Sequence, residues 1–229
     1  ARPALFSWAF FWEHPMDITG QDLGNHETTP VQNQGRILLL ACGALAREIL
    51  DIINHHGFSH MDLKCLPAIL HNTPEKITPL IEEKITHHRE RYDEIFVLYA
   101  DCGTGGLLQS ACERLGVKML QGPHCYSFFE GNKDFAKREE FTAFYLTDFL
   151  VRQFDAFVWK PLGLDRHPEL ISMYFGNYTK LVYQAQNPTD DLIDKARVYA
   201  DQMGLEFAGA RIDGGAAPAL AGWLAALPD

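Results

Sequence analysis

The feature that most constrains the fold of this chain is a repeated order of apolar run, glycine turn and amphipathic stretch, which begins at Arg36. Residues 37–41 form a short, wholly apolar run, and residues 95–100 form another. Runs of this kind are typical of parallel strands that are buried on both faces. After the first run, apolar residues recur on one helical face until Gly57. This alternation predicts an α/β fold with a parallel sheet and right-handed crossovers.

We expect a Rossmann-like parallel sheet of about four to five strands with flanking helices, followed by a helical second half. The strands are expected at residues 37–41, 66–70, 95–100, 117–120 and 205–212. Long helices are expected through residues 135–154 and 169–186. Because no low-complexity linker divides the halves, residues 36–229 are expected to form a single α/β domain. Residues 1–35 are expected to be an irregular arm with an aromatic tip that packs on the domain or joins a homo-oligomer.

The charge and composition of the chain exclude several classes of protein. Its 30 acidic and 20 basic residues give a formal net charge of -10, and no basic cluster offers a site for a nucleic-acid backbone. No segment approaches the roughly 18 consecutive apolar residues of a membrane helix. The five cysteines are an odd number without an export signal, which favours a reducing compartment. We therefore expect a cytoplasmic protein that binds neither nucleic acid nor membrane.

Three of the five cysteines follow apolar runs, at positions where strands are expected to end. They are Cys42, Cys102 and Cys125. The carboxyl ends of the strands in an open α/β sheet line the crevice where ligands bind, so the three thiols are expected to converge there. Three such thiols suit a soft metal or an iron–sulfur cluster. Cys65 and Cys112 lie elsewhere in the pattern and are expected to pack in the core.

The expected cofactor is a [4Fe–4S] cluster held by these three cysteines, with one coordination position left open for substrate. Zinc is the alternative, although the paired Cys-x-x-Cys spacing common in zinc sites is absent. A fourth ligand from His71, His124 or His167 would favour zinc.

Polar residues near the cysteines could transfer protons or bind substrate. The expected proton-transfer residues are Asp101, His124 and His167. The expected substrate-binding residues are polar or belong to a glycine-rich turn, and they are His71, Asn72, Gly103, Thr104, Asp165 and Arg166. Arginine suits bidentate recognition of a carboxylate or phosphate, so the loop at residues 163–167 is expected to face the same crevice. Asp148 is a plausible ion-pair partner of Arg166.

Several motifs of this chain resemble those of the DUF1638 family of proteins of unknown function. They are A-C-G-A-L-A-R-E, L-H-N-T-P-E-K-I, Y-A-D-C-G-T-G-G-L, G-P-H-C-Y-S-F, F-Y-L-T-D-F-L-V-R and L-G-L-D-R-H-P-E-L, spread over about residues 36–204. The resemblance implies that the family's motif residues are Cys42, His71, Asn72, Asp101, Cys102, Cys125, Asp165, Arg166 and His167. Members of the family look like neighbours of corrinoid-dependent methyltransferases, which implies a link to one-carbon or methylated-amine metabolism.

Three functions remain open at this point. The first is a metalloenzyme that acts on a small polar metabolite through the three-cysteine site. The second is an accessory or chaperone protein, whose partner is a corrinoid protein or a corrinoid-dependent methyltransferase. The third is a hydrolase with one cysteine nucleophile and His124 or His71 as its base, in which two of the three cysteines tolerate substitution.

Overall fold

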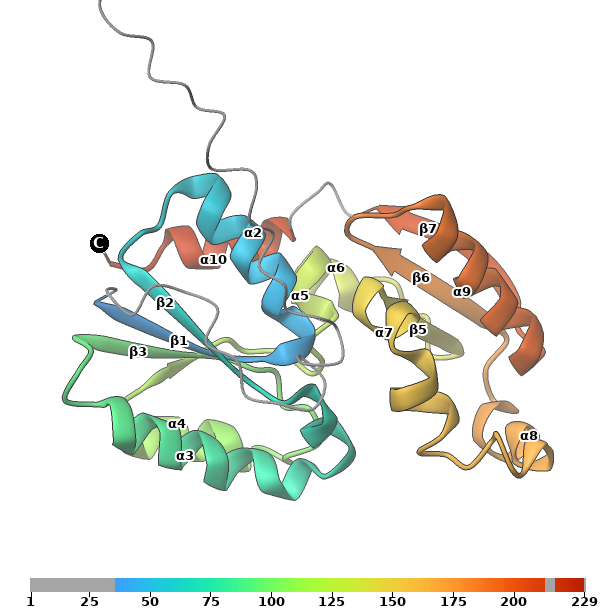
Figure 1. Ribbon diagram of the computed structural model, residues 1–229, viewed down its shortest axis with the longest axis horizontal. Coiled ribbons are helices and arrows are strands. Elements are labelled where there is room, and N and C mark those ends of the chain that lie inside the picture. The colour runs from blue at the N-terminus through green and yellow to red at the C-terminus, as the bar shows by residue number, and fades with distance from the viewer. Residues whose placement is uncertain (1–35, 213–216, 229) are drawn as a thin grey trace, which may run out of the picture.

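The computed structural model describes residues 36–212 and 217–228 and contains two parallel sheets (Figure 1). The first sheet has four strands in the order β2-β1-β3-β4, and the second has three in the order β5-β6-β7. Helices flank both sheets, so the α/β prediction is confirmed. The aromatic arm expected at residues 1–35 lies outside the described residues. No helix in the described part of the chain is long and apolar enough to cross a membrane.

The first sheet is built around β1 (Ile37–Cys42), all of whose residues are buried. Its neighbours are β2 (Met61–Leu66) and β3 (Glu94–Leu98), and β3 pairs in turn with β4 (Lys118–Met119). The strand expected at residues 66–70 is wrong, because β2 lies earlier. Residues after Pro67 instead form the 3-10 helix η3 (Ala68–Asn72), since proline has no N–H to continue a strand ladder.

Helices cover both faces of the first sheet, as Figure 1 shows. One face packs against α2 (Ala46–His56) and α10 (Pro218–Ala225), and the other against α3 (Ile77–His88) and α4 (Leu107–Leu115). The short 3-10 helices η2 (Gly43–Leu45) and η4 (Pro74–Lys76) lead into α2 and α3. Leu220 and Leu224 of α10 are fully buried in the same core as β1, so the end of the described chain completes the first sheet's packing.

The second half contains a sheet that was only partly expected. Its strands are β5 (Ala143–Thr147), β6 (Lys180–Ala185) and β7 (Glu206–Ile212), and only β7 was predicted. The long helices expected through residues 135–154 and 169–186 are therefore wrong, since β5 and β6 lie within them. The helical segments of this half are α6 (Asn132–Ala136), α7 (Asp148–Arg152), the π-helix η5 (Asp155–Trp159), the 3-10 helix η6 (Pro168–Leu170), α8 (Ile171–Phe175) and α9 (Asp190–Met203).

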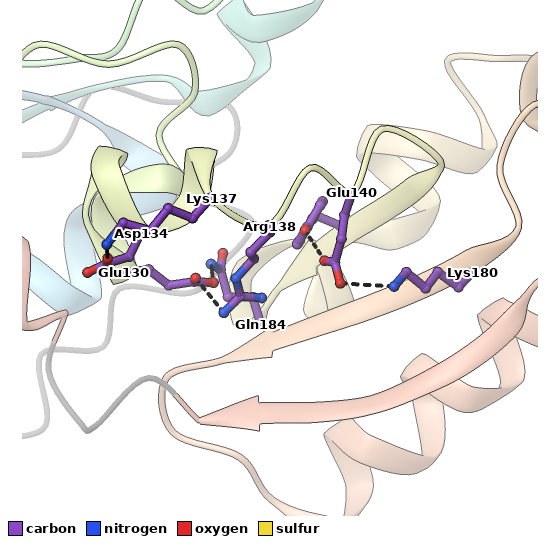
Figure 2. A network of polar contacts seen from close by, with 8 residues as sticks. Glu130, Asp134, Lys137, Arg138, Glu140, Lys180 and Gln184 are labelled. Atoms are coloured by element: carbon purple, nitrogen blue, oxygen red, sulfur yellow. Dashed lines mark hydrogen bonds and ion pairs between the residues drawn. The ribbon is translucent and has the colours of Figure 1, made fainter.

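The two sheets have separate hydrophobic cores and meet through α5 (Ser127–Glu130), α6 and α7 (Figure 1). Figure 2 shows polar contacts that tie α5 to the second sheet: Glu130 accepts from Gln184 of β6 and pairs with Arg138. Lys180 Nζ also lies 2.9 Å from Glu140 Oε1. The contact between Glu130 and Gln184 joins α5 to the second sheet, whereas Lys180 and Glu140 both belong to the second half. The single domain expected over residues 36–229 stays a prediction.

Candidate functional site

The structure brings the three singled-out cysteines together at the carboxyl edge of the first sheet. Cys42 is the last residue of β1, Cys102 lies in the turn after β3, and Cys125 lies just before α5. Each thiol interacts electrostatically with the other two. Cys112 is buried on α4, away from the sheet edge. Cys65 pairs with Ala41 inside the sheet and interacts with Tyr99, which also interacts with Cys42 and Cys102. The convergence follows from the topology, because neighbouring parallel strands end at one edge.

A small cavity of about 90 Å³ opens beside Cys42 and Cys125, whereas Cys102 does not line it. Its lining comes from both sheets, because β1 contributes Cys42 and β5 contributes Thr147, each the last residue of its strand. The carboxyl ends of the two sheets therefore face a shared space, which is where ligands bind in open α/β sheets. The complete described lining is Cys42, Ala44, Leu45, Ala68, His71, His124, Cys125, Tyr126, Phe129, Thr147, Phe149, Leu150 and Phe157.

Cys102 has the electrostatics of a reactive thiolate. Hydrogen bonding with Cys125, and secondarily with His71, lowers the pKa of Cys102 to about 5, although burial opposes the change. Its backbone has a φ of 46°, a left-handed conformation that is uncommon for a residue with a side chain. Strained positions of this kind cluster at functional sites, and nucleophiles often occupy a sharp turn between a strand and a helix.

The residues that contact Cys102 have raised pKa values, and their protons stabilise the negative charge of the thiolate. The hydrogen bond with Cys102 raises the pKa of Cys125 well above its ordinary value and is also the main reason that the pKa of His71 is raised. The pKa of Cys42 is raised to about 12, chiefly by burial, so this residue stays a neutral thiol. Near neutral pH the cluster therefore contains the Cys102 thiolate, two neutral thiols and an imidazole with a raised pKa.

His71 stands at the open side of the cluster. The residue is exposed to solvent at its outer surface, while its ring interacts with Cys102 and lines the cavity. Asn72, the next residue of η3, is exposed and does not line the cavity. His71 is thus placed to exchange protons between water and the thiolate.

The glycine-rich turn after Cys102 is bound by the chain's own carboxylate. Asp101 accepts from Gly106 N at 2.7 Å, Gly105 N at 3.3 Å and Thr104 Oγ1 at 3.0 Å. The bond from Gly106 is the main reason that the pKa of Asp101 is lowered. The backbone N–H groups of Gly105 and Gly106 are therefore bonded to Asp101 in this arrangement. The expected roles of Asp101, Gly103 and Thr104 in catalysis and binding stay predictions.

His124 forms part of the cavity wall. Its ring stacks on Tyr126, with ring centroids 4.9 Å apart and an interplanar angle of 15°. Burial lowers the pKa of His124, so its imidazole is neutral near pH 7. A neutral imidazole offers one hydrogen-bond donor and one acceptor to a ligand.

The loop of Asp165, Arg166 and His167 is not brought to the thiols. All three residues are exposed and none lines the cavity; the loop leads to α8 in the second half (Figure 1). His167 Nδ1 lies 3.2 Å from Glu169 Oε1, and Arg166 Nε lies 3.8 Å from Asp165 Oδ1. The substrate and proton-transfer roles expected of this loop stay predictions.

Asp148 does not pair with Arg166, contrary to the ion pair considered from the sequence. Its carboxylate accepts from Tyr183 OH at 2.7 Å and from the backbone N–H groups of Gln186 and Asn187. The ion-pair contact of Asp148 is with Arg152 of its own helix, at 3.9 Å. Asp148 therefore connects α7 to the end of β6.

The contacts of the three cysteines bear on whether these side chains could hold a metal ion. In the described part of the chain, no three histidine, cysteine, aspartate or glutamate side chains converge as ligands of one metal ion. Three thiols are donors that suit iron or zinc. In the structure, however, Cys102 and Cys125 form a hydrogen bond with one another, and Cys42 lies against Tyr99. As they lie, these side chains do not fit a single bound ion, and the iron–sulfur and zinc assignments stay predictions.

Two residues near the site were not predicted from the sequence. Tyr99 is fully buried and lies against Cys42. Glu48 of α2 is buried among apolar residues, and its Oε2 has no hydrogen-bond partner among the described residues. A sequence signal for Glu48 exists, because it lies three residues after Leu45 and four before Ile52 on the apolar stripe of α2.

Comparison with known proteins agrees with the motif resemblance. The sequence profile of a family described as "Protein of unknown function (DUF1638)" matches residues 65–216. The matched segment contains His71, Cys102, His124 and Cys125, while Cys42 lies before it. No curated protein matches the chain.

Proposed function

We propose that this protein, which belongs to the DUF1638 family of proteins of unknown function, is an enzyme that uses Cys102 as a nucleophile. The observation behind the proposal is the contact of Cys102, at a strained turn, with both Cys125 and His71. Cys125 and His71 line the cavity, and Cys102 lies behind them. A thiolate, not a thiol, is the attacking species, and the two contacts favour that charge on Cys102. An adjacent histidine is the usual partner of a catalytic cysteine.

The reaction class that fits these groups is acyl transfer to the thiol, followed by hydrolysis. Cys102 Sγ attacks the carbonyl carbon of the substrate, and the bond to the leaving group breaks. His71, whose pKa is raised by its hydrogen bond with Cys102, donates a proton to the leaving group. Water then attacks the thioester, His71 takes a proton from that water, and the Cys102 thiolate departs. Cys125 stabilises the thiolate before attack and after release by donating its S–H.

The pH dependence of alkylation at Cys102 tests this proposal. Purified protein is treated with iodoacetamide between pH 4 and 10, and each cysteine is followed by peptide mass spectrometry. Modification of Cys102 should rise with a midpoint near pH 5, the pKa in the folded protein. Cys112, whose pKa burial raises to about 11, is the internal control and should react only in alkaline solution.

The variant His71→Gln separates an activated thiolate from an accessible thiol. Without the imidazole, the midpoint at Cys102 should move to higher pH, because one stabilising contact is lost. The control His87→Gln changes a histidine on α3 that is exposed and should leave the midpoint unchanged. A wild-type midpoint near the ordinary value of about 8.5 would reject the proposal.

A second candidate is the metalloprotein with a three-cysteine site. It is supported by the position of the three thiols, which come from separate segments of the sheet edge and meet in one place. Metal and acid-labile sulfide analysis after anaerobic purification tests this candidate.

Cys42→Ser discriminates between the two candidates. In the three-cysteine metal site it should remove metal, whereas the Cys102 nucleophile should keep its low-pH alkylation in the same variant. Both candidates are compatible with two predictions from the sequence: association with a corrinoid protein or methyltransferase, and a cytoplasmic location.

A further inference from the structure

Two of the three thiols at the sheet edge lie in loops that are bonded to one another. Asp101, which precedes Cys102, donates its backbone N–H to Gly122 O at 2.9 Å, so the turn after β3 runs beside the loop that carries Cys125. The side chains of Cys102 and Cys125 form a hydrogen bond with one another. A disulfide bond of about 2.05 Å between them would therefore replace a contact that the two sulfurs already make.

We infer that Cys102 and Cys125 are a redox pair, which a hydroperoxide oxidises to a reversible disulfide. One thiol attacks an oxygen of the hydroperoxide and becomes a sulfenic acid, while the O–O bond breaks and water, or an alcohol from an organic hydroperoxide, leaves. The second thiol attacks the sulfenic sulfur, so that the S–S bond forms, the S–O bond breaks and water leaves. The two thiols lose two electrons and two protons, and the hydroperoxide takes up both.

The backbone around this pair differs from the backbone around the third thiol. Cys102 and Cys125 both lie in turns, outside the hydrogen-bonded ladders of the sheet. Cys42 ends β1, where it pairs with Leu66, and the side chain that bonds to it is that of Tyr99. A disulfide between Cys102 and Cys125 requires movement of two turns, whereas a disulfide to Cys42 requires displacement of a central strand. The geometry therefore favours the first pairing.

A small oxidant can reach the pair from the cavity. Cys125 is half-buried and lines this cavity, whose volume of about 90 Å³ is that of roughly three water molecules in the liquid. Hydrogen peroxide has only two oxygen atoms and is small enough to enter. Cys102 lies behind Cys125 and is 6% exposed. Either thiol can be oxidised first, because the other lies in contact with its sulfur.

The disulfide has a consequence for catalysis, which, unlike the disulfide itself, rests on the proposed function. In the oxidised pair Cys102 Sγ is bonded to Cys125 and has no thiolate with which to attack a carbonyl carbon. A thiol reductant restores the nucleophile through thiol–disulfide exchange. Oxidation of the pair thus inactivates the enzyme reversibly.

Disulfide mapping after treatment with hydrogen peroxide tests the pairing. The reduced full-length chain is treated with a small excess of hydrogen peroxide, alkylated with N-ethylmaleimide in denaturant, digested and examined by mass spectrometry. Cys102 should be linked to Cys125, while Cys42, Cys65 and Cys112 are alkylated, and dithiothreitol should make all five cysteines alkylable again. Disulfides shared among Cys42, Cys102 and Cys125, or sulfinic acid in place of the disulfide, overturn the inference.

Serine variants test the mechanism of closure. Cys102→Ser and Cys125→Ser each keep one thiol of the pair, so neither should form the disulfide. In at least one of them, dimedone should capture sulfenic acid on the remaining thiol at least about tenfold more than on the same residue of the wild type. Cys42→Ser is the matched control and should retain the wild-type disulfide yield, because it removes the neighbouring thiol that lies outside the pair. A disulfide yield that falls as far in Cys42→Ser as in Cys125→Ser refutes the pairing.

Alkylation with iodoacetamide separates this inference from the proposed function. A Cys102 that alkylates with a midpoint near pH 5 but forms no disulfide retains the nucleophile and refutes the redox pair. A disulfide that forms in a protein whose midpoint is near pH 8.5 retains the redox pair and refutes the nucleophile. With both in place, alkylation of Cys102 at pH 7 should fall at least about tenfold after peroxide treatment and return with dithiothreitol.

Discussion

Glu48 offers the sharpest test of the packing between the two halves. Its carboxyl is buried on the apolar face of α2, next to Asp148 and Arg152 of α7, and one of its oxygens has no hydrogen-bond partner among the described residues. Burial is the main reason that its pKa is raised to about 7, and the charge of Asp148 adds to the increase. Glu48→Gln keeps the size and shape of the side chain and removes the ionisation.

The sign of the effect follows from proton binding. The folded state holds the Glu48 proton more tightly than the unfolded state, so this carboxyl supports folding most at low pH and loses that contribution as pH rises through 7. A change in pKa from 4.5 to about 7 corresponds to about 3 kcal/mol once both states are ionised. Most of this penalty develops between pH 5 and pH 8 in the wild type, and none develops in Glu48→Gln.

Urea denaturation of both proteins at pH 5 and pH 8 measures the effect. The free energy of unfolding of Glu48→Gln, relative to the wild type, should rise by about 2 to 3 kcal/mol from the lower to the higher pH. Glu90→Gln, an exposed change after α3, is the control and should show no comparable rise. A relative free energy for Glu48→Gln that is the same at both pH values would refute the reasoning.

Two further changes test contacts in the second half. Asp148→Ala removes the acceptor for Tyr183 OH and for the backbone N–H groups of Gln186 and Asn187. In urea denaturation, the free energy of unfolding should fall by about 3 kcal/mol or more. A loss below about 1 kcal/mol would contradict this prediction. Thr189→Ala removes the side chain that accepts from Leu192 N at the start of α9, and should lower the melting temperature with a cost of about 1 kcal/mol, whereas Thr189→Ser should retain most of the stability.

The first sheet was predictable because its strands are buried on both faces. β1 and β3 are nearly continuous apolar runs, a pattern that helices rarely share at that length. β5 was mistaken for helix because Phe141, Phe144, Tyr145 and Phe149 have the spacing of a helical stripe. In the structure Phe141 is 88% exposed, so the stripe was an accident of spacing and not a buried face.

The convergence of the three cysteines could be anticipated from topology, but their chemistry could not. The sequence marks Cys42 and Cys102 as strand-end residues, and parallel strands bring such residues to one edge. Which thiol ionises depends on contacts with Cys125 and His71, and these contacts are set by turns that have no periodic signal. The loop at Asp165–His167 was placed with them by chemical type alone, which does not determine position.

The return of α10 to the first sheet has a consequence for how the protein is made. In the order of synthesis α10 follows the entire second sheet, yet Leu220 and Leu224 fill the core around β1, and Trp223 meets Phe96 edge to face at 5.8 Å. A nascent chain that has emerged only as far as α9 therefore exposes the apolar face that α10 will cover. Exposed apolar surface of this kind is prone to aggregation and is a target for chaperones, so the first half must wait for the second before its folding is complete.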